Sequence, residues 1–184
     1  TFIRWPEGEL ARLLFHELSH QVVYVGDDTM FNESYATAVE RLGGGLWLST
    51  RADAAAREEY ARHDGRRQDF RALVGRTRAE LAALYAGPLP EADKRAAKAE
   101  VFARLRAEHR RLKAERWGGF AGYDGWFERA NNATLGAHAA YNELVPPFER
   151  LFEQQGRDWA RFHAEVKRLA ALPKDQRRAA LGPP

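Results

Sequence analysis

The sequence predicts a mainly α-helical protein, and three observations lead to this prediction. Apolar residues recur three and four positions apart along most of the 184-residue chain, which is the period of a helix with one buried face. Proline and glycine clusters separate these segments and mark their ends. No series of short segments alternates apolar and polar residues, so we expect no β-sheet.

The N-terminal part contains two expected helices. Pro6 suits the first turn of a helix, because the N–H that proline lacks would have no partner there. Apolar residues follow at helical spacing: Leu10, Leu13, Leu14, Leu18 and Val22. We expect this stripe to be buried and the helix to end at Gly26. A second helix is expected over about 32–42, where it would stop at the three glycines 43–45.

The middle of the chain predicts a long helical hairpin. Thr50 and Asp53 resemble a capping box that opens a third helix, which extends to about Tyr85. The turn 87–90 stops it, and a fourth helix is expected over 91–116. Two long helices joined by so short a turn should pair antiparallel and bury one apolar stripe. That stripe consists of Leu73, Leu81, Leu84, Val101, Phe102, Leu105 and Leu112.

The rest of the chain predicts a loop, short helices and a tail. Residues 117–126 are rich in glycine and aromatic residues, as in a loop. Helices follow over about 131–144, 147–155 and 158–171, and the chain ends in a polar tail. The length fits one domain, 1–184, with the hairpin 50–116 as an insertion and 117–184 as C-terminal helices.

Composition limits the classes of function. No segment approaches the ~20 apolar residues of a membrane helix, so we expect no membrane insertion by this chain. Cysteine is absent, which excludes disulfides and thiolate metal ligands. The net charge is −4 over residues 1–50 and +7 over residues 51–184. The basic part interleaves Arg with Glu and has no nucleic-acid-binding motif, so we expect solvated helix surfaces and no nucleic-acid partner.

The motif HELSH, within residues 15–20, suggests a metal site. In a helix, His16 and His20 stack on one face and can bind one ion. Glu17 lies about 100° round the helix from His16, near enough to hold a water on that ion without ligating it. The alternative is a helix with two surface or core histidines. If the apolar stripe buries the helix, Glu17 needs a positive partner, and Zn²⁺ would supply that charge.

A catalytic zinc site has three protein ligands and one open position. The next histidine after His20 is His63, far along the chain, so the third ligand would be a carboxylate. The nearby candidates are Asp27, Asp28, Glu33 and Glu40. The two aspartates lie in a turn, where Asp is common for turn chemistry alone. Glu33 opens the next helix, and we favour it.

The segment FNESYATAVE, residues 31–40, resembles the second zinc segment of the gluzincin metallopeptidases. It is similar to the N-E-G-F-A-x-x-x-E pattern of the neutral zinc aminopeptidases, with Ser34 in place of Gly and Tyr35 in place of Phe. This resemblance implies a gluzincin-like helical zinc-site core with Glu33 as the third ligand. It also implies a second shell of Asn32 and Glu40, in which Glu40 accepts the N–H of a ligating imidazole.

The whole chain resembles a bacterial family of putative aminopeptidases. The similarity runs through RWPEGELARLLFHELSHQVVYV, FNESYATAVE, NNATL, YNELVPPFERL and LAALP. Members are longer, and the chain is similar to their C-terminal, metal-carrying half. Their N-terminal half often begins with a lipoprotein signal. The resemblance therefore implies a peptide substrate, the N-terminal half as a partner, and a periplasmic or membrane-anchored location.

Peptide hydrolysis also needs a hydrogen-bond donor to the carbonyl oxygen as that oxygen becomes anionic. The candidates are Tyr123, Asn131, Asn132, His138, Tyr141 and His163. We favour Tyr141, which follows the family-like NNATL segment, although a packed tyrosine is the alternative. The two asparagines could equally cap the helix that follows them. His63 and His109 lie in the charged hairpin, and we expect both to be solvated.

These observations predict a zinc-dependent peptide hydrolase, an aminopeptidase by resemblance. Glu17 would act as general base toward a metal-activated water. The alternative is a non-enzymatic helical interaction module with a structural or vestigial metal site. A structural zinc site is usually closed by four ligands, and neither a cysteine nor a third nearby histidine is present.

Overall fold

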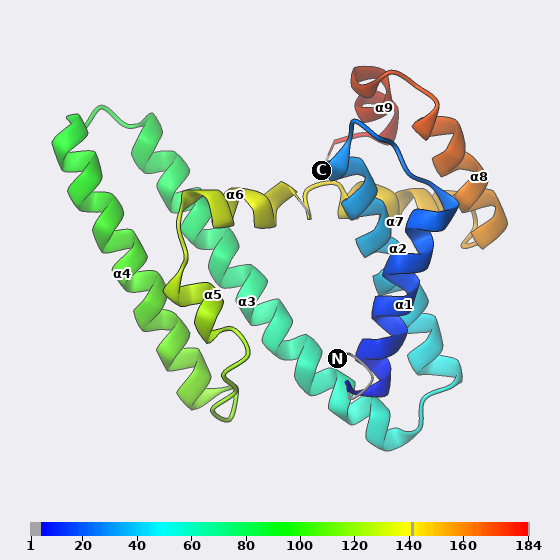
Figure 1. Ribbon diagram of the computed structural model, residues 1–184, viewed down its shortest axis with the longest axis horizontal. Coiled ribbons are helices and arrows are strands. Elements are labelled where there is room, and N and C mark those ends of the chain that lie inside the picture. Colours follow the sequence, from blue (N-terminus) through cyan, green and yellow to red (C-terminus); the bar gives the residue numbers. More distant parts are fainter. Residues whose placement is uncertain (1–4, 141, 184) are drawn as a thin grey trace. The chain divides into compact units, whose positions relative to one another are not determined.

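The computed structural model describes residues 5–140 and 142–183 (Figure 1). These residues form nine helices and no strand, which confirms the mainly α prediction. They divide into two compact units. The first unit comprises Thr1–Ala61 and Ala140–Pro184, and the second comprises Arg62–Ala139. None of the helices in the described ranges is long and apolar enough to cross a membrane.

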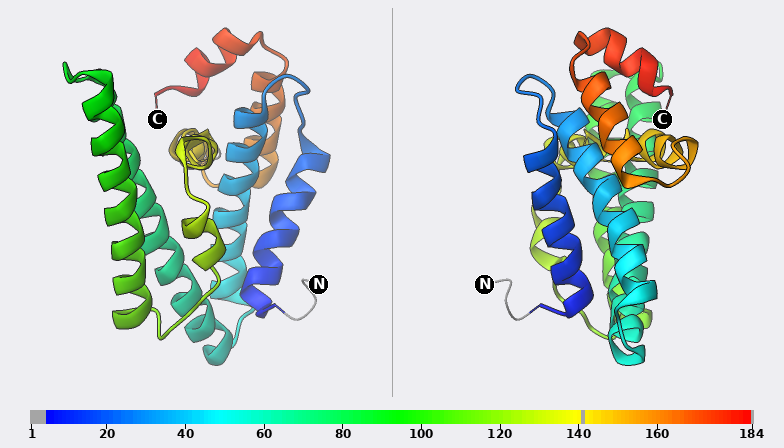
Figure 2. Two further views of the ribbon diagram at one scale, coloured as in Figure 1. Left: turned by 60° about the vertical axis from the view of Figure 1, so that its left-hand side comes forward. Right: turned by 90° about the vertical axis from the view of Figure 1, so that its right-hand side faces the viewer.

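The first unit is built on two antiparallel helices, α1 (Glu7–Val22) and α2 (Thr29–Thr50). They lie side by side in the views of Figures 1 and 2. Pro6 precedes the first turn of α1, as expected. Asp28 caps α2, because its side chain accepts a hydrogen bond from the backbone N–H of Phe31 at 3.1 Å.

The three glycines 43–45 do not end the second helix, contrary to our prediction, and α2 continues to Thr50. Their role is close packing against α1. A Cβ added at Gly43 would lie 3.0 Å from the ring of Phe15, and one at Gly44 would lie 2.9 Å from Cγ of Arg12. A Cβ added at Gly45 would meet nothing within 4 Å. Two of the three glycines therefore let α1 approach α2.

This difference predicts opposite effects of two neighbouring substitutions. Gly45→Ala should raise the free energy of unfolding by about 0.5–1 kcal/mol, because alanine favours the helix and meets no obstacle. Gly43→Ala should lower it, because displacing the Phe15 ring costs about 1–3 kcal/mol and outweighs that gain. Urea denaturation of both variants measures the effects. Equal shifts in the two variants would contradict the close approach at Gly43.

The predicted apolar stripe of α1 is not buried. Leu14 is 51% exposed and Leu18 is 60% exposed. The face that packs on α2 instead carries Arg12 and Ser19, which are 3% and 2% exposed. The facing side of α2 includes Gly43, Gly44 and Glu40, against which the ring of Phe15 and the side chain of Arg12 pack. Helical spacing identified the helix but assigned the buried face wrongly.

The other side of α2 forms the core of the first unit. Phe31 and Tyr35 are fully buried there and pack against Phe148 of α7 (Val145–Gln154), with ring centroids 5.1 and 5.7 Å apart. α8 (Trp159–Ala170) adds Phe162 and further apolar residues to the same cluster. α2 therefore packs on α1 with one face and on the C-terminal helices with another.

The expected polar tail contains a helix, α9 (Lys174–Leu181). Its Arg177 donates to Asp28 at 2.7 Å, and Arg178 donates to the same carboxylate at 3.0 Å. Arg177 is 3% exposed and lies over the Phe31 ring, 5.2 Å from its centroid. α9 thus fixes the N-terminal end of α2, a long-range pairing that the polar composition of this segment did not predict.

The expected hairpin consists of α3 (Ala54–Ala86) and α4 (Glu91–Glu115), which run antiparallel (Figure 1). The second unit contains α4 and the part of α3 from Arg62 onward. Asp53 caps α3 by accepting the N–H of Ala56 at 2.8 Å, whereas the Thr50 hydroxyl donates back to Leu46, so the predicted capping box is wrong. The predicted stripe lies in the core of this unit, with Leu84 partly buried at its edge.

The stretch expected as a loop contains a short helix, α5 (Asp124–Glu128). The chain reaches it through Gly118 and Gly119, whose φ angles of 59° and 80° favour glycine. α6 (Asn132–Ala140) follows. Asn131 precedes α6 and accepts the N–H groups of Ala133 and Thr134 at 2.8 and 3.2 Å, so of the two roles left open for it, the structure shows the capping role.

Candidate metal centre

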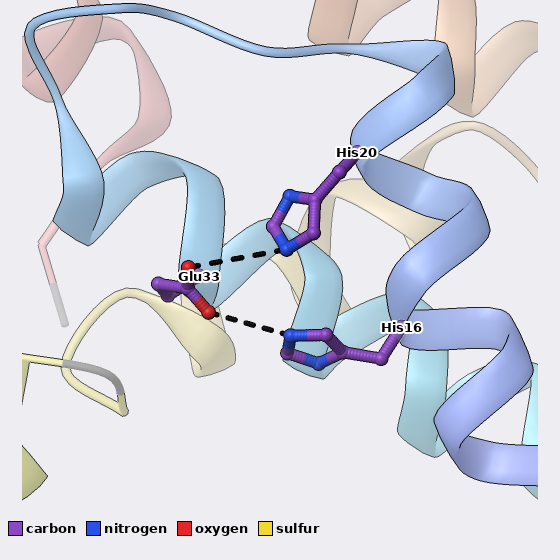
Figure 3. A group of neighbouring side chains, drawn as sticks. All are labelled: His16, His20 and Glu33. Carbon is purple, nitrogen blue, oxygen red and sulfur yellow. Dashed lines mark ion pairs between the residues drawn. The ribbon is translucent and has the colours of Figure 1, made fainter.

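Three side chains from α1 and α2 converge within the first unit (Figure 3). His16 and His20 lie one turn apart on α1, and Glu33 projects from the first turns of α2. One ligand-type atom of each lies within 4.8 Å of the other two. Nε2 of His16 is 3.3 Å from Oε2 of Glu33, and Nε2 of His20 is 3.9 Å from Oε1. The structure brings together the three residues that the sequence indicated as metal ligands.

Asn32 holds the connection between α1 and α2 in place. Its Oδ1 accepts the backbone N–H of Val25 at 2.9 Å, and its Nδ2 donates to the carbonyl of Val25 at 2.7 Å. The side chain is buried, with 2% exposed. Because Glu33 is the next residue, these two bonds fix where α2 starts relative to the end of α1. Asn32 therefore positions Glu33 through the backbone.

Glu40 lies two helical turns after Glu33 on the same side of α2. Its Oε2 is 3.1 Å from Nδ1 of His16, and Arg12 donates to its Oε1. A carboxylate only accepts hydrogen bonds, so Nδ1 of His16 must donate, and Nε2 of the neutral ring keeps its lone pair toward Glu33. The hydrogen bond to Glu40 raises the pKa of His16, although burial alone would lower it.

The donor set fits Zn²⁺. Glu33 forms no ion pair with an arginine or lysine among the described residues, and its side chain is 21% exposed. The lone pair of His16 Nε2 thus faces a carboxylate oxygen at 3.3 Å, which is unfavourable unless a cation or a proton lies between them. Zinc bonds of about 2.0–2.2 Å in tetrahedral geometry separate ligand atoms by about 3.3–3.6 Å. The two separations given above match this spacing after small side-chain movements.

Glu17 lies between the two histidines in sequence and is exposed on α1. Within the described residues it forms no hydrogen bond or ion pair, and it does not belong to the group of convergent ligand atoms. Its negative charge contributes to the raised pKa of His16. The carboxylate therefore lies near the ligands while remaining accessible to solvent.

The two turn aspartates do not join this group. Asp28 is 2% exposed and engaged by Arg177 and Arg178. Burial alone would raise its pKa, but the hydrogen bonds from Arg178, from a backbone N–H and from Arg177 lower it. Asp27 is exposed, and its backbone carbonyl accepts from Lys174 at 3.1 Å. Asp28 stabilises the end of α2 instead of binding a metal.

Two residues of the first unit, Tyr141 and His163, are candidates from the sequence for the hydrogen-bond donor to the transition state. Tyr141, our favoured donor, lies outside the described residues. Nδ1 of His163 is 2.8 Å from the hydroxyl of Tyr35, and its ring packs on Trp159 at 5.7 Å between centroids. Burial raises the pKa of Tyr35 and lowers that of His163. The buried hydroxyl of Tyr35 therefore has a hydrogen-bond partner, and a phenylalanine at this position could not form this bond.

The remaining candidates lie in the second unit. Asn132 exchanges hydrogen bonds with the hydroxyl of Tyr85 at 2.9 and 3.1 Å. Tyr123 stacks on Phe70 at 4.5 Å, and His138 meets the same ring edge-on at 5.3 Å. The Asn132–Tyr85 pair lies at the surface of that unit, and the ring contacts with Phe70 lie at its core.

The two hairpin histidines are not both solvated. His109 is 6% exposed and stacks on Phe127 with ring centroids 4.0 Å apart, so our expectation for it was wrong. Burial lowers its pKa. His63 is half-buried and meets Phe120 at 6.1 Å. Neither histidine belongs to the convergent group on α1 and α2.

Replacing both hairpin histidines should leave the zinc content unchanged. We expect this of the double variant His63→Ala/His109→Phe, because the ligands come from residues 16–33 and phenylalanine retains the stack on Phe127. Metal analysis of the purified protein provides the measurement. Loss of zinc from a variant that keeps its helical circular dichroism would place the site in the hairpin.

The sequence did not indicate Arg12, which the structure places beside Glu40. A signal was available, because Arg12 precedes His16 by four residues and therefore shares its helix face.

Comparison with known proteins identifies a family. The model of a family described as "Putative aminopeptidase" matches residues 1–181. No curated protein and no solved structure matches the chain.

Proposed function

The chain belongs to the Putative aminopeptidase family, and from this we propose that it is a zinc-dependent peptide hydrolase with Glu17 as its general base. The observation that carries the proposal is the convergence of His16, His20 and Glu33 within 4.8 Å. Two imidazole nitrogens and one carboxylate oxygen are the ligand set of a catalytic zinc site.

His16, His20 and Glu33 would hold the ion. When bound, Zn²⁺ supplies Lewis acidity, which lowers the pKa of a water toward ~7 and polarises the substrate carbonyl. Three protein ligands leave a coordination position open for that chemistry. The hydrogen bond from His16 Nδ1 to Glu40 keeps the Nε2 lone pair directed at the site.

Glu17 accepts a proton from the attacking water and returns it to the leaving amine. The water oxygen forms a bond to the carbonyl carbon, the carbon–nitrogen bond breaks, and the released amine receives the proton. Two features support this role. Glu17 follows His16 directly on the helix, and no described residue engages its carboxylate.

The family description favours an exopeptidase that requires a free α-amine. The test compares an aminoacyl-amidomethylcoumarin with its N-acetylated form, before and after removal of metal by 1,10-phenanthroline. We expect hydrolysis of the free-amine substrate alone, loss with the chelator, and recovery with added Zn²⁺. Equal cleavage of the N-acetylated substrate would overturn the aminopeptidase assignment, and activity unaffected by the chelator would overturn the zinc assignment.

A helical interaction module with a structural metal is the second candidate. The exposed leucines Leu14 and Leu18 on α1 favour it, because such residues often mark a binding surface. The group of three ligands with an exposed glutamate beside it favours the enzyme, since a structural zinc site normally has four ligands.

A further inference from the structure

Arg12 occupies the interface between α1 and α2, one helical turn before His16. It is 3% exposed, which is unusual for arginine. Its guanidinium donates to Oε1 of Glu40, and the other oxygen of that carboxylate lies 3.1 Å from Nδ1 of His16. Arg12, Glu40 and His16 therefore form one continuous polar chain that ends at a ligand of the candidate metal centre.

The surrounding residues give Arg12 a defined position. Gly44 lies against its side chain, because a Cβ at Gly44 would come within 2.9 Å of Cγ of Arg12. The ring of Tyr60 lies 5.8 Å from the guanidinium carbon. Tyr60 in turn packs on Gly8, where an added Cβ would lie 2.8 Å from its ring. Two glycines and an aromatic ring thus make room for a buried arginine at this point.

We propose that Arg12 is a positioning residue, which fixes the Glu40 carboxylate so that Glu40 in turn fixes the ring of His16 with Nε2 toward the metal. This inference rests on the proposed metal site and adds to it a residue that acts without ligating the ion.

Arg12 is needed because Glu40 has several rotatable bonds and unfavourable neighbours. Glu33 and Glu17 are negatively charged and close to His16, so the carboxylate of Glu40 requires a positive partner to stay beside them. Arginine meets this need better than lysine, since its planar guanidinium donates in fixed directions. With Oε1 held by Arg12, Oε2 remains directed at His16.

The test measures the Kd of Zn²⁺ by competition with a fluorescent zinc chelator. We expect Arg12→Met to raise this Kd by about 10-fold or more, as is typical when an outer partner of a metal-binding histidine is lost. Arg12→Lys should recover part of the affinity, because an ammonium group still neutralises Glu40. Arg41→Met is the matched control, since Arg41 pairs with Glu149 at 3.4 Å, away from the ligands.

A second pair of variants tests the same inference without removing the charge. Gly44→Ala should displace Arg12 and raise the Kd of Zn²⁺, as Arg12→Met does. Gly45→Ala should leave the Kd unchanged, because nothing lies within 4 Å of its added Cβ. If Arg12→Met does not fold, the Kd values of Zn²⁺ for Arg12→Lys, Gly44→Ala and Gly45→Ala test whether Arg12 has a positioning role.

Imidazole ¹⁵N NMR of the metal-free protein separates this inference from the proposed function. At a pH high enough to keep the imidazole neutral, wild-type His16 should be the tautomer with the proton on Nδ1. Arg12→Met should lose that preference, whereas Arg41→Met should keep it. If the wild type binds no Zn²⁺, the proposed function fails, and the NMR comparison still decides whether Arg12 positions His16. If a folded Arg12→Met binds Zn²⁺ as the wild type does, with an unchanged tautomer, Arg12 has no positioning role.

Discussion

Glu17→Gln should retain bound zinc and lose peptide hydrolysis by on the order of 10²-fold or more. Glutamine has nearly the shape of glutamate but cannot accept the proton of the attacking water. The three proposed ligands are unchanged, so the metal content should stay at the wild-type level. The effect should appear mainly in kcat, because the proton transfer takes place in the chemical step.

Glu7→Gln is the matched control for this variant. Glu7 lies in the first turn of the same helix, is exposed, and undergoes the same loss of one negative charge. It should retain activity and zinc. If the wild type hydrolyses peptides and Glu17→Gln does so at a comparable rate, another group is the general base.

The largest effect on stability is expected for Asp28→Ala, at about 3–5 kcal/mol of unfolding free energy. The substitution leaves the buried guanidinium of Arg177 without its carboxylate partner, and it removes the cap of α2. Asp27→Ala at the neighbouring exposed position should change stability by less than about 0.5 kcal/mol. Chemical denaturation of both variants measures the difference. Equal stability of the two variants would contradict the structural role of Asp28.

The stability that Asp28 contributes should depend on pH, and the same variants measure this dependence. The folded state lowers the pKa of Asp28, so its stabilisation is fully present above the unfolded carboxyl pKa of about 3.9. It is lost as the pH falls below that value, because the folded state must then accept a proton that it binds poorly. The difference in the free energy of unfolding between the wild type and Asp28→Ala should therefore become smaller below pH ~4.

The features that the sequence predicted correctly depend on local spacing. His16 and His20 share a helix face because they are four residues apart, and this needs no knowledge of tertiary structure. The hairpin stripe followed from helical periodicity and from the turn at 87–90. Glu33 was favoured over the aspartates because it opens a helix, while they lie in a turn. It converges with the two histidines, and its role as a metal ligand stays a prediction.

The features that the sequence did not predict depend on tertiary contacts, that is, on which helices pack against each other. The same glycines can end a helix or let another helix approach, and only the position of Phe15 and Arg12 shows which applies at residues 43–45. The apolar stripe of α1 was expected inside, yet the packed face is the one that carries Arg12. The pairing of Asp28 with Arg177 joins residues 149 positions apart, which no local pattern indicates.

The central claim is that one zinc ion is bound by His16, His20 and Glu33. Crystals of the zinc-loaded protein, measured above and below the zinc absorption edge, test it most directly. We expect an anomalous peak bonded to Nε2 of both histidines at about 2.0–2.1 Å and to a Glu33 oxygen at about 2.0–2.2 Å. A peak on Asp27, Asp28 or Glu40 with Glu33 turned to solvent would contradict it, as would a peak at His63 or His109.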